Sequence, residues 1–116
     1  MSETYNLFQP GRRHLRACMA AQATVSLEKA KQRETDKASI REALGIAYFR
    51  IRRWSEAEAE FRAVLEISPV NDYAHYALGR SLEKQGRARE ANVHYKLASS
   101  LQPESAQYRA RIRELD

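Results

Sequence analysis

The sequence predicts an all-α protein built as a stack of helical hairpins. A block of residues recurs after 34 positions, and within each block the apolar residues follow the spacing of helices. The composition agrees, because 43% of the 116 residues are hydrophobic, 30% are charged, and only four are glycine and three proline. Few helix breakers are present, so this composition favours helices throughout a single domain, residues 1–116.

The repeat becomes visible when residues 38–71 are aligned with residues 72–105. Small apolar, large apolar and turn-forming residues recur at one offset while the residues between them vary, which is typical of a packing frame rather than of a catalytic motif. The identical pairs are Ala43/Ala77, Leu44/Leu78, Gly45/Gly79, Arg53/Arg87, Glu56/Glu90, Ala57/Ala91 and Pro69/Pro103.

Each repeat contains two predicted helices joined by a short turn. In residues 38–71, one apolar stripe spans positions 40–51 and a second spans 57–67, with Ser55 as the expected N-cap of the second helix. A glycine inside a helix costs about 1 kcal/mol relative to alanine. Gly45 therefore indicates a close helix crossing, which is expected against Ala57.

This pattern resembles the tetratricopeptide repeat, a helix–turn–helix unit of 34 residues. The family pattern is matched by Leu44, Gly45, Tyr48, Ala57, Phe61 and Pro69, and again by Leu78, Gly79, Ala91, Tyr95, Ala98 and Pro103. The second of these units departs from the family at Leu82, where a tyrosine is usual. The resemblance implies a right-handed α-α superhelix of about three repeats with a C-terminal capping helix.

Residues 4–37 carry a degenerate copy of the unit, whose repeat positions hold Gly11, Ala23, Leu27 and Ala30. Pro10 stands where the next unit has Leu44, and proline is tolerated only in the first turn of a helix. We therefore expect a short first helix that begins near Pro10 and turns near Cys18 and Met19. One unbroken helix over about residues 12–33 is the alternative, because residues 17–23 contain no helix breaker.

The remaining elements follow in chain order. Residues 38–71 and 72–105 form the two clear repeats, and Asp72 is the expected N-cap at the start of the second. Gly86 is expected to supply the turn inside that repeat, where the preceding repeat has Arg52. The final segment, residues 104–116, is predicted to be a capping helix that packs on the last repeat through Tyr108, Ile112 and Leu115. About seven helices are expected in total.

The sequence also argues against several functional classes. No run of 18 apolar residues and no signal-peptide pattern is present, so we expect no membrane segment and a cytoplasmic protein. The single cysteine, Cys18, rules out an internal disulfide and a cysteine metal cluster. The three histidines occupy unlike repeat positions, and hydrolase and phosphate-loop motifs are absent. We therefore expect no enzyme activity, no cofactor and no metal, and interpret the acidic run Glu56, Glu58 and Glu60 as a solvated helix face.

The resemblance implies a concave groove lined by the first helices of the repeats. Carried over by position, its candidate residues are Arg16, Glu42, Ile46, Phe49, Arg50, Tyr73, Tyr76, Arg80 and Lys84. Three basic residues among them are spaced by 34, and Arg53 and Arg87 add a second repeated basic position, so stacking is expected to form a basic rim. The alternative is that these cations only complement the dipoles at helix C-termini.

Aromatic residues give the groove its second expected feature. Phe49, Tyr73 and Tyr76, with Ile46, are expected to converge where residues 38–71 meet residues 72–105, as anchors for a bound partner. The alternative is that Phe49 and Tyr73 only pack adjacent repeats together.

These residues favour a non-catalytic protein–protein interaction module, an adaptor that holds a segment of another protein in the groove. The basic rim favours an acidic segment. Some members of the family grip the C-terminal carboxylate of chaperones, but those positions here hold Glu42, Ile46 and Ala77, so that activity is not implied. The alternative is a protein that binds RNA or another nucleic acid, because the net charge is +5 and tyrosines lie beside arginines. The chain is expected to be a monomer or a weak homodimer.

Overall fold

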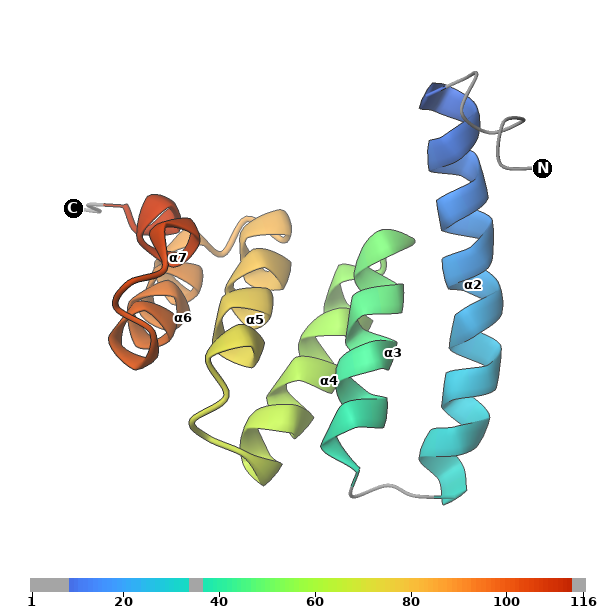
Figure 1. Cartoon of the computed structure of the whole chain (residues 1–116), viewed down its shortest axis with the longest axis horizontal. Helices are drawn as coiled ribbons and strands as arrows, with labels where there is room; N and C mark the ends of the chain where they lie inside the picture. Colours follow the sequence, from blue (N-terminus) through green and yellow to red (C-terminus); the bar gives the residue numbers. More distant parts are fainter. Residues whose placement is uncertain (1–8, 34–36, 114–116) are drawn as a thin grey trace.

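The computed structural model describes residues 9–33 and 37–113, with side chains from residue 17 onward except that of Arg33. Within these residues every regular element is a helix, as the sequence predicts, and the helices number six rather than about seven. They are α2 (Gln9–Arg33), α3 (Ala38–Arg50), α4 (Trp54–Ile67), α5 (Asp72–Lys84), α6 (Ala88–Leu101) and α7 (Ala106–Arg111) (Figure 1).

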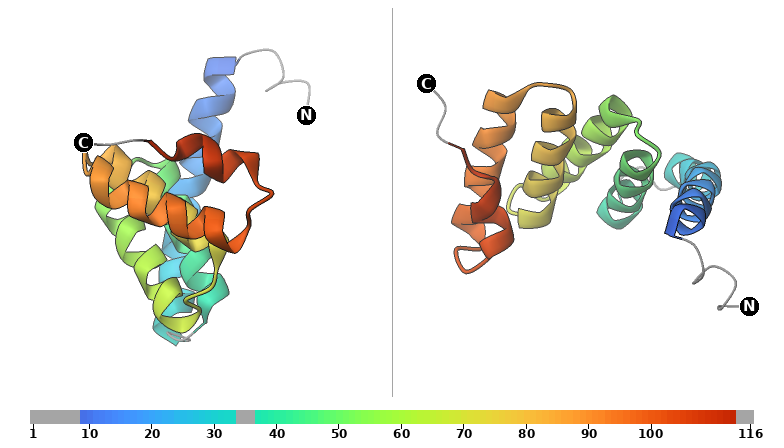
Figure 2. Two further views of the ribbon diagram at one scale, coloured as in Figure 1. Left: turned by 90° about the vertical axis from the view of Figure 1, so that its left-hand side faces the viewer. Right: turned by 90° about the horizontal axis from the view of Figure 1, so that it is seen from above.

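The helices are stacked in chain order. α3 and α4 form one hairpin, α5 and α6 form the next, α2 packs beside α3, and α7 packs on α6 (Figures 1 and 2). α3 and α5, the first helices of the two hairpins, also touch each other. The hairpins lie within residues 38–71 and 72–105, and the unit boundaries themselves remain a prediction.

The core runs through both hairpins and is built from the repeated apolar positions. Its largest fully buried side chains include Leu44, Phe61, Leu78, Leu82 and Tyr95. Full burial of a large apolar side chain stabilises a protein by about 1.5–3 kcal/mol, so these positions dominate the stability of the stack.

The repeated glycines allow the two helices of each hairpin to approach closely. An added Cβ at Gly45 would lie 2.8 Å from the Phe61 ring, and one at Gly79 would lie 2.5 Å from the Tyr95 ring. The atoms nearest to that Cβ at Gly45 belong to Phe61, and the expected crossing against Ala57 stays a prediction. The aromatic ring on the second helix occupies the space that a side chain at the glycine would need.

Both hairpins turn through the same backbone motif. The residue after the C-cap has a positive φ, 66° at Arg52 and 79° at Gly86. The next residue donates its backbone N–H five residues back, from Arg53 to Tyr48 over 2.9 Å and from Arg87 to Leu82 over 3.0 Å. This is the Schellman arrangement, in which glycine is the favoured residue at the position with positive φ.

The helix starts differ from the predicted caps by one or two residues. Asn71, not Asp72, caps α5, and its side chain accepts the Ala74 N–H over 3.0 Å. α4 begins at Trp54 rather than after Ser55, because the turn motif ends at Arg53 and the helix follows at once.

The first unit departs most from the expectation. The predicted turn near Cys18 and Met19 is wrong, since α2 is helical without interruption from Gln9 to Arg33, as the alternative proposed. The stretch Ala17 to Ala20 contains neither glycine nor proline, so nothing in it interrupts the helix.

α2 is joined to the next hairpin by polar contacts. The Glu60 carboxylate, 6% exposed, accepts hydrogen bonds from Lys31 Nζ at 2.9 Å and Arg41 Nη1 at 3.2 Å. The Tyr48 hydroxyl donates to Glu28 on α2. Glu60 is thus buried and paired, which corrects its interpretation as part of a solvated face.

α7 covers the other end of the stack and is shorter than the predicted helix. Tyr108 is buried, and its hydroxyl donates to Asp72 over 2.7 Å. The helix ends at Arg111 instead of continuing to residue 115, and the Asn92 side chain exchanges two hydrogen bonds of 2.8 Å with the backbone of Arg113. Leu115 lies outside the described residues.

None of the described helices is both long enough and apolar enough to cross a membrane.

Candidate interaction groove

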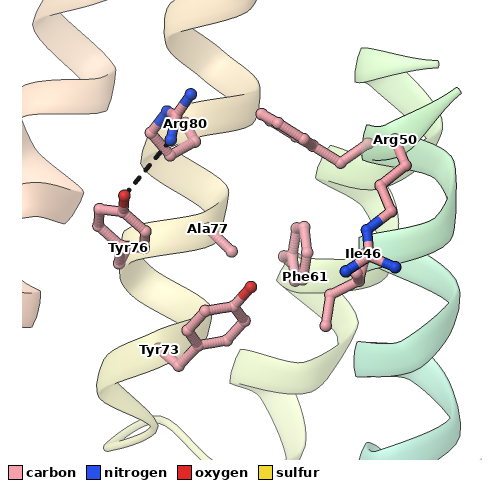
Figure 3. A pocket seen from close by; sticks show the side chains of 8 residues that line it. Ile46, Arg50, Phe61, Tyr73, Tyr76, Ala77 and Arg80 are labelled. Carbon is pink, nitrogen blue, oxygen red and sulfur yellow. Dashed lines mark hydrogen bonds between the residues drawn. The ribbon is translucent and has the colours of Figure 1, made fainter. Parts of the chain in front are cut away.

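α3 and α5 place most of the predicted groove residues around one small pocket. The pocket encloses about 160 Å³ and lies between the two helices, with one residue of α4 at its base (Figure 3). Its walls are formed by Ile46, Phe49, Arg50, Phe61, Tyr73, Tyr76, Ala77 and Arg80. Six of the nine residues predicted from the sequence meet here, and Phe61 and Ala77 complete the lining.

Arg80 is held in position before any ligand arrives. Its guanidinium lies 5.4 Å from the centre of the Phe49 ring. It also donates a hydrogen bond of 3.3 Å to the Tyr76 hydroxyl (Figure 3). Gln107 of α7 donates to the same hydroxyl over 3.1 Å. Burial alone would raise the pKa of Tyr76, but these donors outweigh burial and lower the pKa below its usual value. A cation fixed in this way loses little conformational freedom on binding an anion.

Tyr73 combines an exposed edge with a neutral hydroxyl. The side chain is 39% exposed, and its pKa is raised by burial first and by the Glu42 carboxylate second. The hydroxyl therefore stays protonated and can donate to an acceptor. Glu42 does not line the pocket, but its negative charge lies close enough to act on Tyr73.

Trp54 connects the groove to Lys84 and was not among the residues predicted from the sequence. The Lys84 ammonium lies 5.6 Å from the centre of the Trp54 ring, and the Trp54 ring meets Phe49 edge-on with centroids 4.8 Å apart. Lys84 therefore lies beside the pocket rather than in its wall. The only sequence signal was that Trp54, the single tryptophan, directly follows the predicted turn.

The predicted basic rim is only partly present. Arg50 lines the pocket and is exposed, whereas the side chain of Arg16 lies outside the described residues. Arg87 is paired with Glu58 at 2.9 Å and with Glu90 at 2.7 Å, and Arg53 is 3.7 Å from Glu56. The second repeated basic position is therefore neutralised by carboxylates and adds little positive charge to the groove.

A second, larger hollow continues the groove toward α2. It measures about 780 Å³ and is bounded by α2 and α3, and it shares Ile46 and Arg50 with the first pocket. Its walls are apolar apart from Arg50 and include Met19 and four alanines.

His75 and His94 lie on another face, beside α4. Their rings are stacked with centroids 5.3 Å apart, and their Nδ1 atoms are 3.1 Å apart. His75 Nε2 is 3.0 Å from the Pro69 carbonyl oxygen, which can only accept, so the proton of neutral His75 resides on Nε2. No group of three or more histidine, cysteine or acidic residues is arranged to hold a metal in the described part of the chain.

Comparison with known proteins supports the fold rather than a specific activity. No protein-family model matches the sequence. A 77-residue stretch, 66% of this chain, is 39% identical to the protein O-mannosyl-transferase Tmtc2 of Drosophila melanogaster. That stretch amounts to 8% of the length of Tmtc2, so most of that protein has no counterpart here.

Solved structures match nearly the whole chain. The first TPR of Spaghetti (RPAP3), solved with the HSP90 peptide SRMEEVD, superposes with a TM-score of 0.79 over 90% of this chain and 83% of that one, at 16% identity. Two structures of MamA, from AMB-1 and MSR-1, give TM-scores of 0.72 and 0.74 at 26% and 25% identity. They cover 82% and 92% of this chain, and 55% and 65% of theirs. These likenesses confirm the predicted fold class, an all-α superhelix of helical hairpins.

Proposed function

We propose, from the tetratricopeptide-repeat fold of this chain, that it is a non-catalytic interaction module that holds an extended segment of a partner protein in the groove along α3 and α5. The observation that carries the proposal is the pocket in which Arg80 is fixed between Phe49 and Tyr76. A partner side chain can fill the apolar base while a neighbouring carboxylate meets Arg80 and Arg50.

The preferred segment is acidic and carries an apolar side chain next to its carboxylates. The pocket volume of about 160 Å³ suits one aliphatic or aromatic side chain. Arg50 and Arg80 stand at its edge, and the hydroxyl of Tyr73 can donate to a further acceptor. Charge complementarity of this kind mainly sets specificity and speeds association, while the buried anchor supplies affinity.

The comparisons support a protein or peptide as the ligand class. Spaghetti (RPAP3) was solved with an acidic HSP90 peptide in complex. At 16% identity that structure is informative about fold, and its peptide is not proposed as the ligand here. Transferase activity is not proposed either, because the matched stretch is a small part of Tmtc2.

Charge reversal tests the proposal directly. The probes are short fluorescent peptides with glutamates beside a phenylalanine or leucine, and a matched set with glutamine in place of glutamate. Arg50→Glu with Arg80→Glu is expected to weaken binding of the acidic set by at least about tenfold, equivalent to about 1.4 kcal/mol. Lys96→Glu with Arg109→Glu changes the net charge equally away from the pocket and is expected to have little effect.

Two results would count against the proposal. If both double variants weaken binding equally, the interaction depends on net charge and not on the pocket. If a single-stranded RNA oligomer binds better than every peptide, tolerates changes of sequence and is released by moderate salt, the groove serves nucleic acid instead.

A further inference from the structure

The hollow between α2 and α3 shares three repeat positions with the pocket between α3 and α5. Subtracting 34 from Phe61, Ala77 and Arg80, which line the pocket, gives Leu27, Ala43 and Ile46, which line the hollow. Of the five remaining pocket residues, Tyr73 and Tyr76 have counterparts at Ser39 and Glu42, which do not line the hollow, and the other three come from α3. The same subtraction places their counterparts at positions 12, 15 and 16.

The hollow therefore lacks the helix that would correspond to α3 in the pocket. By the 34-residue register, residues 4–16 are the counterpart of α3, which spans residues 38–50. In this structure residues 9–16 continue straight into the rest of α2 and do not return to pack on it. The missing helix explains why the hollow measures about 780 Å³ against about 160 Å³ for the pocket.

The walls of the hollow also show that it lacks a cover. Ala57 and Ala91 lie at equivalent positions of α4 and α6 and are 0% and 1% exposed. Ala23, at the same position of α2, is only half-buried, and Met19 is 58% exposed. Ala20, Ala23, Ala43 and Ala47 leave room for close approach of another helix.

The chain's own first segment does not cover the hollow, because the chain stays helical at position 18, where the other two repeats turn. The two observed turns use positive φ at Arg52 and Gly86, and the equivalent position is occupied by Cys18 within uninterrupted helix. A side chain makes positive φ unfavourable by roughly 1–2 kcal/mol, and the flanking alanines and methionine favour continued helix. The segment thus stays in line with α2 and points away from the hollow it matches.

We propose that two copies of this chain exchange these segments, so that residues 9–16 of each copy pack into the hollow between α2 and α3 of the other. α2 has 25 residues, about 37 Å at 1.5 Å per residue, whereas α3 has 13, about 20 Å. The first turns of α2 accordingly project beyond α3 (Figure 1), where a second copy can reach them. Exchange of identical elements through an opened hinge is a low-cost route to a dimer.

The exchange would complete the groove. Position 16 is the counterpart of Arg50 and Lys84, so Arg16 of one copy would extend the line of basic side chains in the groove of the other. A dimer would then present two grooves, each with residues from both copies. The exchange itself does not depend on what the groove binds.

Cysteine cross-linking of the full chain tests the exchange. Gly11 and Leu27 are the counterparts of Gly45 and Phe61, which touch in the next repeat. Along one straight helix positions 11 and 27 are about 24 Å apart, too far for a short cross-linker. Gly11→Cys with Leu27→Cys, in a Cys18→Ala background, is expected to give a covalent dimer with a short bis-maleimide. Gly11→Cys with Lys29→Cys, whose second position is exposed, is the matched control and is expected to cross-link at least about fivefold less.

Each outcome decides the proposal. Cross-linking within one chain would show that the segment folds back on its own hollow. If no cross-link forms and light scattering gives the mass of a monomer, the hollow stays open. Either result overturns the exchange. Cys18→Gly, which supplies the residue favoured by the turn, is expected to shift wild-type dimer to monomer while Cys18→Ala stays dimeric. Equal dimer fractions for the two variants would also overturn it.

Discussion

Arg52 occupies a backbone position that glycine suits better. Its φ of 66° matches the 79° of Gly86 in the equivalent turn, and both residues are exposed. Glycine adopts positive φ without the steric cost that a Cβ adds. We expect Arg52→Gly to raise the free energy of unfolding by about 1 kcal/mol, and Gly86→Ala to lower it by a similar amount, as measured by urea denaturation. A lower free energy of unfolding in Arg52→Gly would show that the contacts of the arginine side chain stabilise the protein by more than its positive φ destabilises it.

Gly79 lies where α5 and α6 pack closely against each other. A Cβ there would come within 2.5 Å of the Tyr95 ring, which is 1% exposed and donates a 2.6 Å hydrogen bond to Glu83. Overpacking costs about 1–3 kcal/mol, while replacing a helical glycine by alanine recovers about 1 kcal/mol. Gly79→Ala is therefore expected to lower stability by about 1–2 kcal/mol. Adding Tyr95→Leu should make the alanine less harmful than it is alone, and additive effects in this double-mutant cycle would contradict the ring contact.

At the level of elements, His75 and His94 join α5 to α6, and we expect His94 to make the stability of that hairpin depend on pH. Neutral His75 carries its proton on Nε2, so His94 donates from Nδ1 to His75 Nδ1. Burial, then His75, then Arg62 lower the pKa of His94, and Glu90 opposes them. Glu66 of α4 also borders this face.

The sign of the pH effect follows from that lowered pKa. Below the ordinary histidine pKa of about 6.5, the unfolded chain binds a proton that the folded chain resists. The free energy of unfolding is therefore expected to be highest above about pH 7 and to fall as the pH drops toward 5. Denaturant titrations at several pH values should show a shallower fall in His94→Gln, and an unchanged slope would contradict the role of this pair.

The elements that local sequence predicts well are those with a complete repeat. Leu44, Phe61, Leu78 and Tyr95 lie on regular apolar stripes, so the hairpins α3–α4 and α5–α6 follow from periodicity alone. The course of α2 does not follow from periodicity, because a continued helix and a turn near Cys18 differ little in free energy. The end of α7 also depends on a distant residue, Asn92, which binds the backbone of Arg113.

The groove residues that follow from the alignment of the repeats could be predicted from the sequence. The contacts that depend on residues distant in the sequence could not. The alignment of the repeats predicted that Ile46, Phe49 and Tyr76 lie close together, and they line the same pocket. No local pattern distinguishes Arg80, which stacks on Phe49, from Arg87, which pairs with Glu58 of the other hairpin, 29 residues away in the chain. Burial of Glu60 escaped prediction for the same reason, since its partners Lys31 and Arg41 come from two other helices.

For the whole molecule, stability should decrease from the inner hairpins toward the N-terminal end. A stack of repeats is held together by contacts between neighbours, so an end element is supported from one side only. α5 has eight buried residues among thirteen and neighbours on both sides, whereas α2 packs mainly on α3 and adds one ion pair, from Lys31 to Glu60 of α4. Amide hydrogen exchange is therefore expected to be slowest in α5 and fastest in the first turns of α2.

If the chain dimerises, amide hydrogen exchange at the N-terminal end should depend on protein concentration. If the first turns of α2 pack into a second copy, their amides are protected only in the dimer, and mass action couples protection to protein concentration. Dilution by about a hundredfold is expected to speed exchange over residues 9–16 while leaving α5 unchanged, because α5 gains nothing from the second copy. A uniform acceleration along the chain would mean that dimer and monomer differ in global stability. Protection of residues 9–16 that ignores dilution would mean that these turns are stabilised within a single chain.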